Sequence, residues 1–224
     1  RREVWSALTS PSKFLLLLAH FIVAIAAVTV WQSRPRVSAI AGIAVFAATS
    51  AFALRWGVTD VDVVGQQWDW LDALGLSITL EMDSFAVMMV LIVSILGASV
   101  LAYSLAYFDP DSTMSRFVSY FIAFAGVMSG MVMSADIFTM FVFWELTSVF
   151  SFLLIALKSE TSEARISALR ALLVTSAGGL SLLTGVILLQ VAVGTTSFRE
   201  LADLAPTGTD VTTAADLALV GAFT

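Results

Sequence analysis

The run of residues 136–157, DIFTMFVFWELTSVFSFLLIAL, constrains the fold of this chain more than any other stretch. It is apolar over the length that a helix needs to cross a hydrocarbon core, about 20 residues for about 30 Å. Glu145 lies about nine residues past Asp136, or roughly 13 Å along a helix, close to the middle of such a span. An ionised carboxyl at that depth costs at least ~2.5 kcal/mol. The run therefore predicts a membrane helix with a buried acid.

Two explanations for Glu145 are open. Acids inside membranes commonly face a bundle interior or a wet cavity and mark ion or proton paths. An acid can also serve packing alone, by hydrogen bonding to a neighbouring helix. We favour the ion path, because a leucine would pack without the cost of a buried charge.

The composition places the whole chain in a membrane. Of the 224 residues, 59% are hydrophobic and only 12% are charged, which is too apolar for a soluble domain. The chain has no cysteine and a single histidine, so it cannot build a cysteine-ligated iron–sulfur cluster or a structural zinc site, and we expect no cofactor. The net charge of −6 is not that of a nucleic-acid-binding protein. We expect the sequence to be part of a longer chain.

Six complete spans and the start of a seventh are predicted, which makes the fold class all-α, a polytopic membrane helical bundle. The first apolar run is too long for a signal-peptide core and lacks a cleavage motif, so we expect it to be retained. The spans cover approximately residues 14–31, 37–54, 84–108, 117–133 and 136–157, then a sixth that ends near 194 with its apolar part from 171, and a seventh that begins near 214.

Residues 55–83 form the one long loop. Its tryptophans, Trp56, Trp68 and Trp70, suit a membrane–water interface, and the alternation in residues 76–81 predicts a small hairpin on the membrane surface. Its six carboxylates could form an ion funnel, but we favour a solvated exterior loop. A second polar loop is predicted at residues 195–213.

The fourth and fifth spans must be antiparallel neighbours, because residues 134–136 alone connect them. The fourth span contains Gly126 and Gly130 in a G-x-x-x-G pattern, which permits close helix approach. We expect this pattern to pack within the chain rather than to dimerise it.

The basic residues suggest an orientation in the plasma membrane. Counted over short loops, one side of the bundle is richer in Lys and Arg, so we place it in the cytoplasm and the N-terminus and the loop 55–83 outside. The cytoplasmic side holds Arg34, Arg36, Arg116, Lys158, Arg165 and Arg170, and the exterior side holds Arg1, Arg2, Lys13, Arg55 and Arg199.

Arg170 is the second candidate for the ion path. If the fifth and sixth spans turn near residue 160, the residue level with Glu145 is about 175, and Arg170 lies ~7 Å nearer the cytoplasm. A cation near a carboxyl favours its charged form. The Cβ tilt of a helix, however, points Arg170 toward the cytoplasmic interface, where a long side chain can snorkel. Both roles, a charge that influences Glu145 and an interfacial anchor, are open.

Hydroxyl side chains near Glu145 could hold water. The candidates are Thr139, Thr147, Ser148, Ser151, Thr175 and Ser176. The ordinary alternative, which we favour for each, is a hydroxyl bonded to its own helix backbone. His20 could carry protons, but a lone histidine among leucines is more commonly a packing contact between helices.

The residues around Glu145 also resemble a known family. The stretch FWELTS at residues 143–148, FLLI at 152–155 and ALLVT at 171–175 with Gly178 and Gly179 are similar to the antiporter-like membrane subunits shared by Mrp-type Na⁺/H⁺ antiporters and respiratory complex I. The likeness is strongest to the large A subunit of Mrp antiporters. MDSF at 82–85 and YSLAYF at 103–108 fit the same family.

The resemblance implies a fold of fourteen helices with two inverted five-helix repeats. Residues 1–115 would then hold helices one to three and the exterior loop, and residues 116–224 the first part of the first repeat. Glu145 would be the proton-path acid, and Arg170 would stand where the family has a lysine. Arginine holds its proton too tightly to relay it, so it could only tune Glu145. The next lysine of the family would follow Thr224.

The implied function is that of one subunit in a multisubunit cation/proton antiporter, an ion-translocating transporter rather than an enzyme. Its partners would be other membrane subunits, and H⁺ and Na⁺ its substrates. One alternative is a proton-pumping subunit of a redox complex, of complex I or membrane hydrogenase type. Another is a structural membrane scaffold in which Glu145 only holds helices together.

The predicted orientation can be tested by single-cysteine labelling. Glu160→Cys should be protected from an impermeant thiol reagent in intact cells and should react in everted vesicles, because the turn at residues 158–165 is predicted to be cytoplasmic. Labelling of residue 160 from outside intact cells would refute the orientation.

Overall fold

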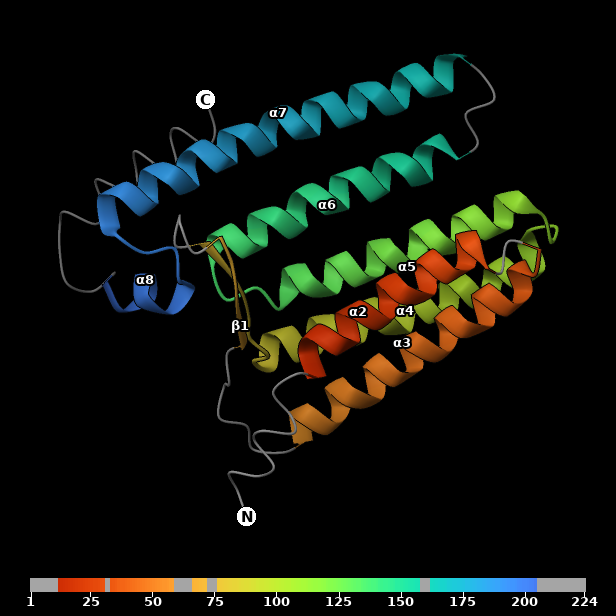
Figure 1. The fold of residues 1–224 in the computed structure, drawn as a ribbon, viewed down its shortest axis with the longest axis horizontal. Coiled ribbons are helices and arrows are strands. Elements are labelled where there is room, and N and C mark those ends of the chain that lie inside the picture. Colours follow the sequence, from red (N-terminus) through yellow and green to blue (C-terminus); the bar gives the residue numbers. More distant parts are fainter. Residues whose placement is uncertain (1–11, 31–32, 59–65, 72–75, 158–161, 205–224) are drawn as a thin grey trace.

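The computed structural model describes residues 12–30, 33–58, 66–71, 76–157 and 162–204. Within these ranges the chain forms seven helices and one antiparallel hairpin of two strands (Figure 1). In chain order they are α2 Ser12–Thr29, α3 Pro35–Val58, β1 Gln66–Leu71, β2 Leu76–Leu80, α4 Ser84–Tyr107, α5 Ser112–Val132, α6 Ile137–Ala156, α7 Ser162–Val193 and α8 Phe198–Leu204. The predicted seventh span and residues 158–161 of the predicted cytoplasmic turn lie outside the described residues.

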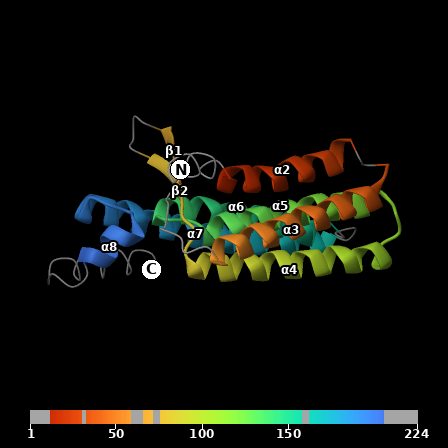
Figure 2. The same cartoon turned by 90° about the horizontal axis from the view of Figure 1, so that it is seen from below.

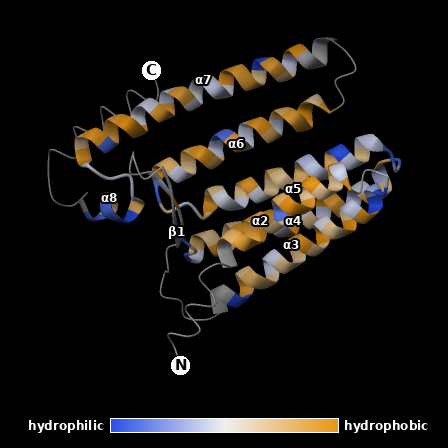
Figure 3. Cartoon of the chain, viewed as in Figure 1, coloured by the Kyte–Doolittle hydropathy of each residue, from blue (hydrophilic) through white to orange (hydrophobic). Residues whose placement is uncertain are grey.

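The long helices follow the apolar runs. Among the described residues, five helices are long and apolar enough to cross a membrane, and α2 adds the shorter apolar run Phe14–Thr29. A helix bonds its own backbone N–H and C=O groups, which a hydrocarbon environment requires. Figure 3 shows hydrophobic residues along the helices, with most of the hydrophilic residues near their ends. The predicted class, a polytopic all-α bundle, is confirmed.

Helices α2, α3, α4 and α5 pack around a common core. Phe46 from α3, Leu101 from α4 and Ile122 from α5 are fully buried there, together with Ala24 and Ala27 of α2. Helix α5 contacts α2, α3, α4 and α6 and is the most buried of the five spans. The core thus draws on both predicted segments, 1–115 and 116–224, whose assignment to repeats stays a prediction.

The glycine pattern on α5 packs within the chain, as predicted. A Cβ atom added to Gly126 would lie 2.7 Å from the Cβ atom of His20 on α2, and one added to Gly130 would overlap the ring of Phe143 on α6. Only glycine therefore permits both close contacts.

Helices α6 and α7 extend the bundle on one side (Figure 1), and in the view from below they overlap the other long helices (Figure 2). Helix α6 packs against α5, which confirms that the fourth and fifth predicted spans are neighbours, and α7 packs against α6. The outer face of α7 is apolar: Val174 and Val191 are 75% and 80% exposed. Such a face suits contact with lipid or with another membrane subunit.

The hairpin, the α5–α6 connection and α8 meet at one end of the bundle (Figure 1). The N–H group of Ala135 donates to the carbonyl of Thr79 at 2.9 Å, and the N–H group of Phe198 donates to the carbonyl of Ala135 at 3.1 Å. The backbone of one connecting residue thus holds β2 on one side and α8 on the other. The predicted hairpin is confirmed, while the side chains of Trp56, Trp68 and Trp70 lie outside the described part of the chain.

Helix α8 corrects one prediction. The sequence predicts a polar loop at residues 195–213, yet Phe198–Leu204 is helical. The helix is too short to show a clear apolar period, and its contacts come from residues distant in sequence, namely Ala135 and Glu81. The residues of α8 and their neighbours in sequence therefore do not predict this helix.

Aspartates cap three of the helices. The carboxyl of Asp83 accepts from the N–H group of Ala86 at 2.7 Å at the start of α4, Asp111 caps α5, and Asp136 caps α6 by accepting from the N–H group of Thr139. The hydrogen bond from the backbone N–H of Met114 holds the pKa of Asp111 below its ordinary value. These caps satisfy donors that have no partner in the first turn of a helix.

Thr139 joins the α6 cap to the hairpin. Its buried hydroxyl donates to Asp136 Oδ2 at 2.6 Å and accepts from the N–H group of Thr79 at 3.0 Å. The bond between the hairpin backbone and this side chain spans 60 residues of sequence. This hydroxyl therefore helps to hold the hairpin on the bundle, together with the backbone bonds of Thr79 and Glu81 to the α5–α6 connection.

Thr139→Val should lower the free energy of unfolding of the full-length subunit by about 1–3 kcal/mol, because it leaves a carboxylate oxygen and a backbone N–H group unpaired. Thr49→Val is the matched control, since among the described residues that buried hydroxyl bonds only the carbonyl of Val45, one turn earlier in its own helix. The measurement is unfolding in mixed detergent micelles. Equal losses for the two variants would contradict the proposed role of Thr139.

Candidate functional site

Glu145 lies near the middle of α6, and its carboxyl group reaches α7 at Gly179. A Cβ atom added to Gly179 would overlap Glu145 Oε1 and lie 2.7 Å from its Cδ atom. Oε1 is buried and has no hydrogen-bond partner among the described residues. A buried oxygen without a partner is costly, and more so when it carries charge. Ionisation of this carboxyl would therefore cost more free energy than ionisation of a carboxyl exposed to water.

A cavity of about 290 Å³ lies between α5, α6 and α7, lined by the α6 residues on both sides of Glu145 in sequence but not by Glu145 itself. Four of the hydroxyl residues predicted to surround Glu145 line it: Thr147, Ser148, Ser151 and Thr175. The other lining residues are Phe124, Met128, Met131, Trp144, Phe152, Ile155, Ala171 and Leu172. The hydroxyls therefore come together in one mostly apolar cavity.

Three of these four hydroxyls donate to their own helices, which is the arrangement that we favour from the sequence. Thr147 and Ser148 both donate to the carbonyl of Trp144, at 2.7 and 3.3 Å, and Thr175 donates to the carbonyl of Ala171 at 2.8 Å. A hydroxyl that has donated its one proton can still accept hydrogen bonds. The cavity wall is therefore suited to accept hydrogen bonds from water or a hydrated proton.

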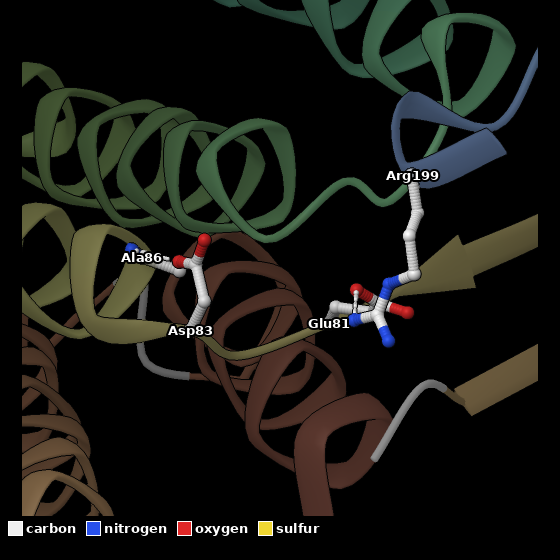
Figure 4. Close-up of polar contacts among 4 residues, drawn as sticks. All are labelled: Glu81, Asp83, Ala86 and Arg199. Carbon is white, nitrogen blue, oxygen red and sulfur yellow. Dashed lines mark hydrogen bonds and ion pairs between the residues drawn. The ribbon is translucent and has the colours of Figure 1, made fainter. Parts of the chain in front are cut away.

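A second cavity, of about 480 Å³, lies toward the end of the bundle that carries the hairpin. Its polar lining includes Glu81, Asp83 and Arg199. Arg199 donates to Glu81 Oε2 at 2.9 Å, while Asp83 turns to the N–H group of Ala86 (Figure 4). Two of the six acidic residues of the predicted exterior loop thus have structural partners and also line a cavity.

The two cavities approach each other at Trp144. Both are lined by Trp144 and Met131, so these side chains stand between them. Glu145 follows Trp144 directly in α6. One cavity lies on the side of the α6–α7 turn and the other on the side of the hairpin, and Glu145 itself lines neither of them.

Arg170 lies farther from Glu145 than the sequence predicts. If the two helices extend equally from a turn at residue 160, residue 175 lies level with Glu145. In the structure the carboxyl instead meets Gly179. Gly179 is nine residues, or about 13 Å along the helix, from Arg170. The difference arises because α7 extends beyond the end of α6 on the side of the turn, so the two helices have unequal lengths between the turn and the level of Glu145. Arg170 is exposed near the start of the apolar segment Ile166–Val193.

Two further candidates lie at different places. Ser176 is half-buried on α7, three residues before Gly179 and so on a similar face of the helix. His20 is fully buried against Gly126 and the ring of Phe46, at 5.5 Å between ring centroids, and its Nδ1 atom bonds the carbonyl of Leu16. His20 thus packs between α2, α3 and α5, away from Glu145, and its Nε2 atom, like Glu145 Oε1, is buried without a partner among the described residues.

Gly179 forms the opposite wall of the site, a role that the sequence did not predict. The available signal was a pair of adjacent glycines near the middle of an apolar helix. Within the residues that the structure describes, no group of three or more His, Asp or Glu side chains is arranged to hold a metal ion.

Two protein-family models match this chain. "NADH:quinone oxidoreductase/Mrp antiporter, TM" matches residues 134–224, which include α6 and α7. "NADH-Ubiquinone oxidoreductase (complex I), chain 5 N-terminus" matches residues 68–118. The two matches together span more than half of the chain. The chain belongs to the antiporter-like membrane subunit family.

Relatives of this antiporter-like protein include named antiporter components. A probable A/B subunit of a K⁺/H⁺ antiporter from Rhizobium meliloti (strain 1021) is 40% identical over 56% of this chain and 13% of that protein. The A1 subunit of a Na⁺/H⁺ antiporter from Staphylococcus haemolyticus (strain JCSC1435) is 35% identical over 59% of this chain and 17% of that protein. The match therefore spans about a sixth of the length of these relatives or less.

Solved structures agree with the antiporter-like fold. The Mrp complex from Dietzia sp. DQ12-45-1b contains a chain with a TM-score of 0.79 and 29% identity, which covers 94% of this chain and 23% of that one. The membrane-bound sulfane sulfur reductase, an archaeal respiratory membrane complex, gives a TM-score of 0.72 over 95% of this chain and 43% of that one. At 22% identity the second likeness supports the fold alone. This antiporter-like protein is a multi-pass membrane protein.

Proposed function

We propose that this chain is a membrane part of a cation/proton antiporter, in which Glu145 takes up and releases the transported proton in exchange for Na⁺. One observation carries the proposal: in the middle of a membrane-length apolar helix, a carboxyl oxygen is buried without a hydrogen-bond partner among the described residues. The residue before it, Trp144, lines two cavities that lie toward opposite ends of the bundle. The relatives named as antiporter subunits support the class of transport.

The surroundings of the Glu145 carboxyl suit a group that binds a proton in one step and releases it in another. A protonated carboxyl is neutral and tolerates an apolar surrounding, whereas an ionised one requires water or a cation. Loss of the proton is therefore favoured when a cation or its hydration water reaches the carboxyl. The hydroxyl-lined cavity would connect Glu145 with the cytoplasmic side, and the cavity at Glu81 and Asp83 would connect it with the exterior.

Partners and orientation belong to the same proposal. The exposed apolar face of α7 supports assembly with other membrane subunits of a hetero-oligomeric complex in the plasma membrane. Arg170, about 13 Å along α7 from the level of Glu145, would act on the carboxyl through its charge rather than by contact. The interfacial anchor is its competing role.

A redox-driven proton pump is the second candidate. The descriptions of both matching family models name NADH oxidoreductases, which favours it. In such a complex the same carboxyl would move protons in response to electron transfer in another subunit. The two candidates differ in one measurable respect, because an antiporter exchanges protons for Na⁺ or K⁺ without any electron donor.

Glu145→Gln, made in the full-length subunit with its partners present, should assemble normally and lose Na⁺-dependent proton exchange. Removal of a buried ionisable group should leave stability unchanged or slightly improved. Glu145→Asp should keep part of the activity, because the carboxylate survives one methylene shorter. The measurement is dissipation of a pH gradient in everted vesicles on addition of Na⁺, normalised to assembled complex. Near-normal exchange by the Gln variant is the result expected of a scaffold and would exclude the proposal.

Arg170→Lys should keep most of the exchange, because the positive charge is retained. Arg170→Ala should move the pH dependence of exchange modestly toward higher pH, because removal of a positive charge that acts through the low-dielectric bundle makes the carboxyl release its proton less readily. The same vesicle assay over a pH series provides the measurement. An unchanged pH profile for the alanine variant would assign Arg170 to the interface as an anchor.

A further inference from the structure

Two adjacent glycines near the middle of α7 have different surroundings. A Cβ atom added to Gly179 would overlap Glu145 Oε1, and it would lie 2.7 Å from Cδ and 3.3 Å from Oε2 of the same carboxyl. A Cβ atom added to Gly178 would have no atom within 4 Å. Gly179 is buried and Gly178 is exposed. Gly179 therefore faces the Glu145 carboxyl, whereas Gly178 does not and can serve as its control.

Backbone conformation does not explain the glycine at position 179. Among the described residues, the one glycine with a positive φ angle is Gly194, so Gly179 has ordinary helical geometry. A glycine inside a helix costs roughly 0.5–1 kcal/mol relative to alanine. What Gly179 provides is space, and the carboxyl group of Glu145 fills that space.

We propose that Gly179 is the positioning residue for the Glu145 carboxyl. Its missing side chain lets the carboxyl lie against the backbone of α7, where Oε1 is enclosed. This inference rests on the proposed function of Glu145, and it adds that exchange requires the carboxyl to lie at this one place on α7. A methyl group at residue 179 would displace the carboxyl rather than the helix, because the carboxyl is the far end of a flexible side chain.

The test compares Gly179→Ala with Gly178→Ala in the full-length protein within its complex. Both substitutions change helix propensity equally, so they differ only in what the methyl group meets. Gly178→Ala should stay within about twofold of the wild-type exchange rate with the same pH profile. Gly179→Ala should assemble at the wild-type level, lose at least about tenfold in exchange rate and shift the pH profile, since even small misplacement of a reacting group is costly.

A double variant keeps the proposal falsifiable if Gly179→Ala assembles poorly. Glu145→Asp shortens the side chain by one methylene and makes room for the methyl group. Glu145→Asp with Gly179→Ala should therefore exchange faster, or assemble better, than Gly179→Ala alone. Independent effects that simply add in the double variant would overturn the inference.

Glu145→Gln in the same assay separates this inference from the proposed function. If the Gln variant exchanges normally, the role of Glu145 itself fails. If the Gln variant is inactive and Gly179→Ala behaves like Gly178→Ala, the role of Glu145 stands and the positioning role of Gly179 is overturned. If the Gln variant and Gly179→Ala are both impaired while Gly178→Ala is not, both are supported.

Discussion

The cost of an unpaired polar group in hydrocarbon governs this structure. Helices satisfy their own backbones, and so the spans are helical throughout. The hairpin and the short helix α8 lie at one end of the bundle, where they bond the α5–α6 connection. Several hydroxyls inside the spans donate to carbonyls of their own helices, as Thr147 and Thr175 do, and Ser119 of α5 donates to the carbonyl of Ala24 on α2. Four buried side-chain atoms have no hydrogen-bond partner among the described residues: His20 Nε2, Ser38 Oγ, Ser94 Oγ and Glu145 Oε1. Of these four, only the Glu145 oxygen belongs to an acidic group.

The helices of the bundle are buried to different extents, and the candidate site lies between the less buried helices α6 and α7. In an 18-residue apolar stretch of each helix, the buried share is 56% for α5, 11% for α6 and 22% for α7. The α2–α5 core therefore supports α6 from one side, and α7 closes the site from the other. A carboxyl held between a well-packed bundle and a lightly packed helix can respond to movement of that helix without disruption of the core.

The spans could be predicted from the sequence because each is an apolar run of the length that a membrane requires. The hairpin was predictable from alternation in residues 76–81, and the close packing at Gly126 and Gly130 from their spacing. The wall that faces Glu145 could not be predicted, because the register of α7 on α6 depends on where each helix ends at the turn. A shift of four residues along α7, from 175 to 179, changed the neighbour of the acid from a threonine to a glycine. Helix α8 was missed for a related reason, since its contacts are distant in sequence.

Infrared difference spectroscopy of the assembled complex, recorded on addition of Na⁺, tests most directly whether Glu145 changes its protonation state during exchange. We predict loss of a carboxylic acid C=O band and gain of a carboxylate band in the wild type, with both absent in Glu145→Gln. The same pair of bands in the Gln variant, or no carboxyl signal in an active wild-type complex, would contradict this role of Glu145.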